Sequence, residues 1–309
     1  MKKLLVPATA ILLGTASFAL ISSDAARADI TISEEPNPAF EALVREFDSA
    51  FVQFETNEAM TVDQEVINGI PVDRRFFPAV LGKMRAWDPA PTCTASLIGP
   101  TTVLIAAHCV DDNPEIRLES SAGSVIGLCI IAPGWNSEAD NGSDLALCTL
   151  NRAVMGITYE RVSFNLPQVG QTVYLTGFGC TEEDGGRDGV LRLGSAPAQN
   201  RPEGFAVSTG TLYTVASIDD GQAVLCPGDS GGPLYVMRGT IDGPRSIIAV
   251  NSATTFERGV SLFAALGAPA NAAFVQSFAN GEFTKDMQGQ LVPQEVCGLN
   301  LDLGCKVEP

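Results

Sequence analysis

From residue 66 onward the chain consists of short apolar runs, and this pattern limits the fold more than any other feature. The runs are rich in Val, Ile, Leu and Thr, and clusters of Gly, Pro, Asn and Asp separate them. Such runs and spacings favour an all-β sandwich or barrel over alternating strands and helices. The clearest runs are residues 102–107, 125–132, 145–150, 173–178 and 246–250. An Ala-rich stretch over residues 269–279 predicts one helix near the end.

The N-terminus predicts export from the cytoplasm. Lys2 and Lys3 precede a run of apolar and small residues over 4–21, and residues 26–28 (ARA) supply a small-x-small pattern. This arrangement is typical of a signal peptide that is cleaved after residue 28. A membrane anchor is the alternative, but the run is at the short end of what spans a bilayer. We therefore expect a soluble periplasmic or extracellular protein whose cysteines oxidise.

The charge of the chain excludes two classes of partner. With 19 basic and 36 acidic residues, its formal charge is −17, so nucleic acid and anionic membrane surfaces should repel it. Residues 29–65 are the most acidic part, with ten acidic residues and one basic. Within them, residues 37–54 carry apolar side chains at helical intervals, which predicts a short helix in a segment outside the main domain.

Two motifs carry candidate catalytic groups. His108, the only histidine, follows an apolar run that ends in two alanines and directly precedes Cys109. A lone histidine is more often structural, but these small neighbours leave its imidazole room to turn toward a partner. Ser230 lies between glycines in residues 226–233 (CPGDSGGP). On such an open turn its hydroxyl can be exposed while the N–H groups of Gly228 and Ser230 point at one spot, as an oxyanion hole requires.

An acidic residue completes a catalytic set. Asp144 immediately precedes the apolar run 145–150, so its carboxylate can be buried at the start of a strand. Aspartate is also a common turn residue, which makes this signal weak on its own, and Asp140 is a second candidate. Together His108, Asp144 and Ser230 supply a general base, an orienting acid and a nucleophile.

The sequence resembles the chymotrypsin/trypsin family of serine endopeptidases. The segments AAHC at 106–109 and GDSGGP at 228–233 lie in the order and approximate spacing of that family. Further matches are VING at 66–69, TGFG at 176–179, GVS at 259–261 and the late helix. The resemblance covers about residues 66–280 and implies two six-stranded antiparallel Greek-key barrels with the active site between them and a C-terminal helix.

The resemblance also implies the chemistry. His108 and Asp144 would come from the first barrel and Ser230 from the second, and they would hydrolyse peptide bonds through an acyl-enzyme intermediate. The expected protein is a secreted monomer that acts on proteins or peptides without a cofactor. A metal site is disfavoured, because the only histidine already has a role and the chain has no CxxC pair.

Activation by proteolysis is a further implication of the resemblance. In relatives an acid at the position of Asp229 pairs with an amino group that proteolysis frees. Here the new terminus would be Val66, released when an activating protease cuts after Glu65. Residues 29–65 would then be an acidic propeptide, followed by the protease domain at 66–280 and a tail at 281–309. Many relatives have Arg where this chain has Glu65, and the alternative is that 29–65 is only a linker.

The substrate pocket is expected to be apolar. Relatives that cut after Lys or Arg carry Asp six residues before the nucleophile, where this chain has Val224. A buried valine cannot neutralise a basic side chain. If residues 251–253 form the pocket wall, Ala253 replaces the usual glycine and narrows the slot. Small or medium apolar side chains are the expected substrates.

Eight cysteines allow more disulfide connectivities than the sequence can decide between. The resemblance implies a bridge that closes the loop under His108, and successive strands should pair two further cysteines. Cys226 lacks its usual downstream partner, and the cysteine after Gly179 is the replacement, as in some bacterial-looking relatives. The expected pairs are Cys93–Cys109, Cys129–Cys148, Cys180–Cys226 and Cys297–Cys305.

Two other function classes remain open from sequence. A catalytically silent relative would serve as a binding module, but the complete His, Asp, Ser and glycine set argues against it. Esterases usually carry G-x-S-x-G with the order Ser, Asp, His, and the order here is different. The tail at 281–309 either packs on the domain or contacts a partner, and packing is the preferred interpretation.

Overall fold

The structure is a computed structural model of the chain. It describes residues 30–50, 67–85, 88, 90–136, 141–180, 186–205, 208–284 and 290–309, without the side chains of 45–50 and 141. The expected signal peptide, residues 1–28, lies outside the described residues. Among the described helices, none combines the length and the apolar character that crossing a membrane requires.

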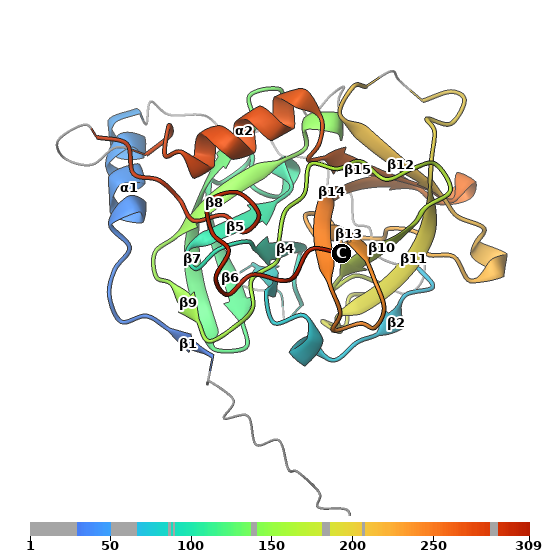
Figure 1. The fold of residues 1–309 in the computed structure, drawn as a ribbon, viewed down its shortest axis with the longest axis horizontal. Coiled ribbons are helices and arrows are strands. Elements are labelled where there is room, and N and C mark those ends of the chain that lie inside the picture. The colour runs from blue at the N-terminus through green and yellow to red at the C-terminus, as the bar shows by residue number, and fades with distance from the viewer. Residues whose placement is uncertain are drawn as a thin grey trace, which may run out of the picture.

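The first barrel is a closed ring of six antiparallel strands. Its strands are β3 (Val80–Met84), β4 (Cys93–Leu97), β5 (Thr102–Ile105), β6 (Glu115–Ser120), β7 (Gly123–Ile131) and β8 (Ala146–Leu150). They follow one another in the order β3-β4-β5-β8-β7-β6 (Figure 1). β6 shows why the sequence forms this surface: Ile116 and Leu118 are buried, whereas Arg117 is exposed, so alternate side chains face the core.

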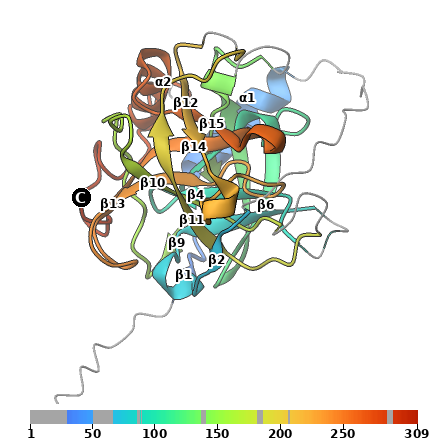
Figure 2. The same ribbon diagram turned by 90° about the vertical axis from the view of Figure 1, so that its right-hand side faces the viewer.

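The second barrel also has six antiparallel strands. They are β10 (Thr172–Gly177), β11 (Arg192–Gln199), β12 (Thr211–Val215), β13 (Pro233–Met237), β14 (Arg245–Thr255) and β15 (Val260–Ala265). Their order is β10-β13-β14-β15-β12-β11, and pairing between β10 and β11 closes the ring. β2 (Ile70–Pro71) adds to β11, and Figure 2 views this barrel from its outer side. The predicted class, two six-stranded antiparallel barrels, is confirmed.

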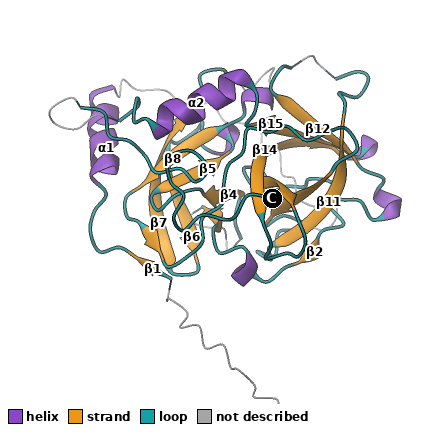
Figure 3. Cartoon of the chain, viewed as in Figure 1, coloured by secondary structure: helices purple, strands orange, loops and turns teal. Residues whose placement is uncertain are grey.

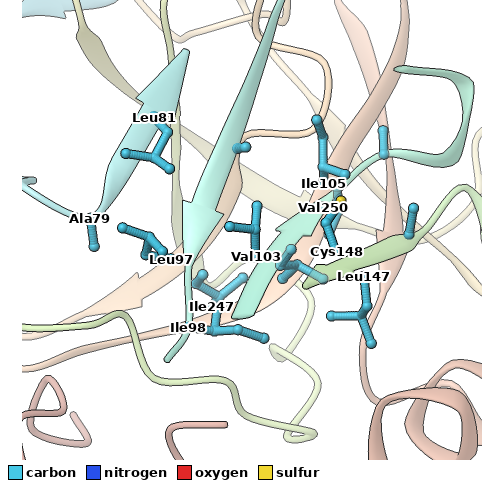
Figure 4. Packing of buried hydrophobic residues seen from close by; sticks show 14 of the residues in the cluster. Ala79, Leu81, Leu97, Ile98, Val103, Ile105, Leu147, Cys148, Ile247 and Val250 are labelled. Atoms are coloured by element: carbon cyan, nitrogen blue, oxygen red, sulfur yellow. The ribbon is translucent and has the colours of Figure 1, made fainter. Parts of the chain in front are cut away.

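One hydrophobic core spans both barrels. Leu97, Val103 and Leu147 of the first barrel pack in the same buried cluster as Ile247 and Val250 of β14 (Figure 4). Fully burying such a side chain is worth about 1.5–3 kcal/mol relative to leaving it exposed. The shared core therefore fixes the position of one barrel relative to the other. Side chains that face each other across the junction of the barrels are held in place in the same way.

The helices lie outside the barrels, as Figure 3 shows. α2 (Pro269–Ala279) has the predicted bounds, begins with a proline at its first position, and buries Phe274 and Phe278. The remaining short elements are 3₁₀ turns and two-residue strands. They are β1 (Thr31–Ile32), η1 (Arg74–Phe76), η2 (Ala107–Cys109), η3 (Asn141–Ser143), β9 (Val154–Met155), η4 (Ile218–Asp220) and η5 (Phe256–Arg258).

The N-terminal segment packs against the main domain, whereas the sequence predicts a segment outside it. It forms the predicted helix as α1 (Pro38–Ala50), but β1 pairs with β9 and α1 contacts β7 and β8 of the first barrel. In Figure 1 the helix lies beside this barrel. The periodicity identified the helix correctly and could not show the surface that receives it.

The tail packs on the protein, which is the interpretation we preferred. Val296 and Cys297 are fully buried, and the Cys297 N–H donates to the Ile98 carbonyl at 2.7 Å. Further along, the Lys306 N–H donates to the Tyr159 carbonyl at 2.8 Å. The tail therefore covers part of the first barrel, and it also contacts the second, because the Arg245 N–H of β14 donates to the Val307 carbonyl at 3.0 Å.

Candidate active site

Strand β5 and a disulfide together place the histidine. β5 ends at Ile105, and η2 turns the chain sharply, with Ala106 and Ala107 fully buried. Larger side chains at these two positions would not fit so close to the core. Cys109 of the same turn is bonded to Cys93 of β4. His108 is thereby held at the end of the barrel with one third of its side chain (33%) exposed.

The carboxylate of Asp144 backs the imidazole. It is fully buried between η3 and β8, and its Oδ2 lies 2.7 Å from Nδ1 of His108. The backbone N–H of His108 donates to Oδ1 at 2.9 Å, and the Ser252 hydroxyl donates to Oδ2 at 2.6 Å. Three donors thus hold the carboxylate in one orientation. Asp140, the second candidate, lies outside the described residues.

The pKa values follow from this contact. Burial disfavours the imidazolium, but the charge and hydrogen bond of Asp144 outweigh it and raise the pKa of His108 above its ordinary value. Burial also disfavours the carboxylate, yet His108 and Ser252 together keep the pKa of Asp144 below its ordinary value. The pair therefore favours a charged carboxylate under a ring that can accept a proton on its other nitrogen.

The loop that carries Ser230 is seated on the first barrel beside this pair. The Thr94 N–H donates to the Ser230 carbonyl at 2.8 Å, and the Thr94 hydroxyl donates to the Gly228 carbonyl at 2.6 Å. Sγ of Cys109 lies 3.7 Å from Nε2 of His108 and 3.7 Å from the carbonyl oxygen of Ser230. The serine and the histidine therefore flank the same sulfur, although they are 122 residues apart in sequence.

Glycines are required where this loop meets the barrel. Gly231 has a φ of 81°, and a Cβ there would lie 2.4 Å from the Thr94 carbonyl oxygen. Gly228 has a φ of 103°, which side chains rarely tolerate. Within the described part of the chain, neither Gly228 nor Ser230 donates its backbone N–H to a protein acceptor. Both donors are available for an oxyanion.

Asp229 is a buried carboxyl without a matching charge in contact. It is fully buried; its Oδ2 accepts from the Cys226 N–H at 3.1 Å, and its Oδ1 has no partner among the described residues. Burial raises the pKa of Asp229 well above its ordinary value, although Gly179 and Arg192 favour the ionised form. A positively charged group that paired with Oδ1 would therefore favour the ionised form of this carboxyl.

The chain around residue 66 approaches the second barrel. Val66 itself lies outside the described residues. Its neighbour Ile67 forms an antiparallel bridge with Val224, with N–H to carbonyl distances of 2.7 and 3.2 Å. Val224 is fully buried in an apolar cluster of the second barrel, and Ala253 packs at the edge of a smaller cluster with Tyr213.

Two supporting residues were not assigned these roles from the sequence. Ser252 appeared there only in a candidate pocket wall, and its bond to Asp144 joins residues 108 apart. Asn271 of α2 is buried, and its Nδ2 donates to the carbonyls of Gly142 at 2.7 Å and Ala265 at 2.8 Å. It thereby ties η3, which leads into Asp144, to the helix. The sequence gives one indication of these roles: each of the two residues is polar and lies within an apolar segment.

The structure forms all four expected disulfides. Cys129 and Cys148 lie directly opposite each other on β7 and β8, while Cys180 ties the end of β10 to the serine loop at Cys226. The ligand atoms of Cys93, His108 and Cys109 lie within 4.8 Å of one another. The two sulfurs are bonded to each other, so this group offers no thiolate to a metal.

Comparison with known proteins agrees with the fold. A family model described as Trypsin matches residues 67–264, more than half of the chain. The chain belongs to the trypsin family. Chymotrypsin-like elastase family member 1 of Canis lupus familiaris is 29% identical to this trypsin-family chain over 189 residues, covering 52% of the chain and 69% of the relative. The Homo sapiens counterpart is 27% identical over 187 residues, with 52% and 69% covered.

A solved structure shares the fold of this trypsin-family chain. Neuropsin, a serine protease expressed in the limbic system of mouse brain, superposes with a TM-score of 0.58 at 17% identity, covering 68% of this chain and 98% of that one. At this identity the likeness concerns the fold alone. The family match and the elastase relatives show that the protein is a serine-type endopeptidase.

Proposed function

We propose that the protein is an exported serine endopeptidase that uses His108, Asp144 and Ser230 as its catalytic groups. The observation that carries the proposal is the contact between a fully buried carboxylate and the ring of the only histidine, beside the serine loop. Asp144 holds the Nδ1–H tautomer, which leaves Nε2 free to act as a base.

The mechanism assigns one step to each group. Ser230 Oγ attacks the peptide carbonyl while Nε2 of His108 takes its proton. The N–H groups of Gly228 and Ser230 stabilise the tetrahedral oxyanion, and each such donor contributes about 3–4 kcal/mol in a comparable protease. His108 then gives the proton to the departing amine, leaving an acyl-enzyme. Water, deprotonated by His108, attacks the ester and releases Ser230.

The proposed specificity is for small or medium apolar side chains rather than Lys or Arg. Val224 offers no charge at the place where a basic side chain would need one, and burying an unpaired ammonium is strongly unfavourable. A peptide library scanned at the residue before the cut should favour small or medium apolar side chains, and a preference for Arg would overturn this assignment.

We also propose that cleavage before Val66 activates the protein. The unpaired Oδ1 of Asp229 is where a new α-ammonium group would bind. The bridge between Ile67, which adjoins Val66, and Val224 in the apolar cluster of the second barrel supports this proposal. Export is supported by the N-terminal signal pattern and by four disulfides. N-terminal sequencing of the active form should read Val-Ile-Asn-Gly.

Peptide hydrolysis by two single variants tests the assignment of the catalytic groups. Ser230→Ala and His108→Ala should each lower kcat about a million-fold, because the two groups act as a unit. Both variants should keep the unfolding midpoint of the parent, since neither side chain belongs to the core. Parental turnover in either variant would contradict the proposal.

A further inference from the structure

The N-terminal segment is joined to the first barrel by a continuous set of backbone contacts. In β1, Thr31 lies opposite Met155 and Ile32 opposite Val154 of β9. Beyond the strand, the Ser33 N–H donates to the Ala153 carbonyl at 2.8 Å. The segment thus covers an edge of the barrel surface whose N–H and C=O groups would otherwise face water.

Asn37 links the strand to the helix and fixes both to the barrel. Its N–H donates to the Asn151 carbonyl at 2.8 Å, and its Nδ2 donates to the Leu150 carbonyl at 2.8 Å. Its Oδ1 accepts the Ala39 N–H at 3.1 Å, which caps the start of α1. One side chain therefore starts the helix and holds it at the end of β8.

The helix buries an apolar face against the same barrel. Ala39, Ala42 and Leu43 are 3%, 2% and 1% exposed, and α1 contacts β7 and β8. Ile32 packs against the main core cluster. On the opposite face of the helix, Glu41 is exposed. Nothing in these contacts requires a peptide bond between residues 65 and 66.

The association cannot depend on a disulfide or on net charge. Residues 29–65 contain no cysteine. They carry a net charge of −9, from one basic and ten acidic residues, and residues 66–309 carry −10, from fifteen and twenty-five. Because the two parts repel each other overall, backbone pairing and apolar burial must hold them together.

We propose that the chain 29–65 stays attached to the β7–β8–β9 surface of the first barrel through β1, Asn37 and α1, as a separate, noncovalent chain after cleavage before Val66. The inference rests on the proposed activation. It makes the active enzyme a two-chain protein in which the propeptide is a permanent structural subunit. Its partner surface is the body of the same protein, and high salt should strengthen the contact or leave it unchanged, because salt screens the repulsion.

The test separates this inference from the activation step. A recognition sequence for an unrelated, sequence-specific protease is inserted after Gln64 in the full chain carrying Ser230→Ala, and the purified protein is cut. On native size exclusion both chains should elute together in low and in high salt, while a denaturing gel separates them. Elution of the segment apart from the body would overturn the inference, and so would its release by high salt.

Two variants and a control locate the contact. Leu43→Asp should release the segment completely after the cut, because it puts a charge into the buried face, and Asn37→Ala should weaken retention in case Leu43→Asp prevents folding. Glu41→Gln, on the exposed side of the same helix, should retain the segment as the parent does. Release by Glu41→Gln, or retention by both of the other variants, would contradict the proposal.

The naturally processed enzyme gives an independent result. Sequencing of its single native peak should return two N-termini, Asp29 and Val66. A body that starts at Val66 without its segment contradicts retention alone, whereas a body that starts elsewhere contradicts the activation step. The engineered cut decides retention in either case.

Discussion

At the scale of the residue, the carboxylate of Asp144 determines the state of His108. The imidazole is partly buried, which alone would lower its pKa, and the contact at 2.7 Å reverses the direction of that shift. Sequence could nominate both residues, because each stands next to an apolar strand. It could not show Ser252 as the third member of the cluster, since strand β14 comes from the other barrel.

Removing the charge of Asp144 should therefore affect both the rate and its pH dependence. Asp144→Asn should lower kcat about 10⁴-fold, as loss of this carboxylate does in another serine protease. Burial, the largest influence on the ring, then loses its main opposing contact, so the pKa of His108 falls and the pH of half-maximal kcat/KM moves down. Asp302→Asn, which is 91% exposed, should leave the profile unchanged. An unshifted profile in Asp144→Asn would contradict the account.

The uncut chain should lose stability as pH rises because of Asp229. Its folded-state pKa is raised well above 3.8, so between about pH 4 and that higher pKa the folded protein keeps a proton that the unfolded chain releases. Denaturant unfolding of uncut Ser230→Ala protein should show this loss, on the order of 3 kcal/mol. Adding Asp229→Asn should remove this loss of stability. Identical pH dependence in the two proteins would contradict the raised pKa of Asp229.

At the scale of the element, short strands were predicted well and their partners were not. The expected run at 173–178 became β10 (Thr172–Gly177), because turn residues bound it on both sides. The surface that receives α1 is built from two strands, β7 and β8, that lie much further along the chain, so no periodicity within 37–54 could reveal it. The same limit applies to α2, whose bounds were predicted but whose bond to η3 was not.

Asn271 tests whether α2 positions the carboxylate of Asp144. Asn271→Ala removes two buried hydrogen bonds, each worth about 1 kcal/mol, and frees η3 to move. The variant should lower kcat roughly tenfold with little change in KM, and the kcat/KM profile should shift to lower pH as the contact between Asp144 and His108 weakens. Gln276→Ala, exposed on the same helix, serves as the control. A stability loss without the pH shift would make Asn271 merely structural.

At the scale of the whole molecule, two barrels share one core and four disulfides close loops of different length. The loop between Cys180 and Cys226 spans 46 residues, and that between Cys297 and Cys305 spans 8. The resemblance to a known family predicted the barrel architecture together with the Cys93–Cys109 and Cys180–Cys226 bridges. Residue chemistry alone would have stopped at an all-β domain with a serine, a histidine and an acid.

Loop length predicts which disulfide matters more for stability. In the chain-entropy treatment the longer loop stabilises by about 1.5 kcal/mol more than the shorter one. The double variant Cys180→Ser/Cys226→Ser should therefore unfold at lower denaturant than Cys297→Ser/Cys305→Ser, and it should also lose activity because Cys226 anchors the serine loop. Equal midpoints for the two double variants would contradict this ordering.

Labelling with a serine-directed phosphonate, followed by peptide mapping, tests the central claim most directly. The processed protein should carry one adduct, on Ser230, and His108→Ala should react far more slowly because Ser230 then lacks its base. A processed protein that stays unlabelled, or that carries its adduct on another residue, would contradict the account.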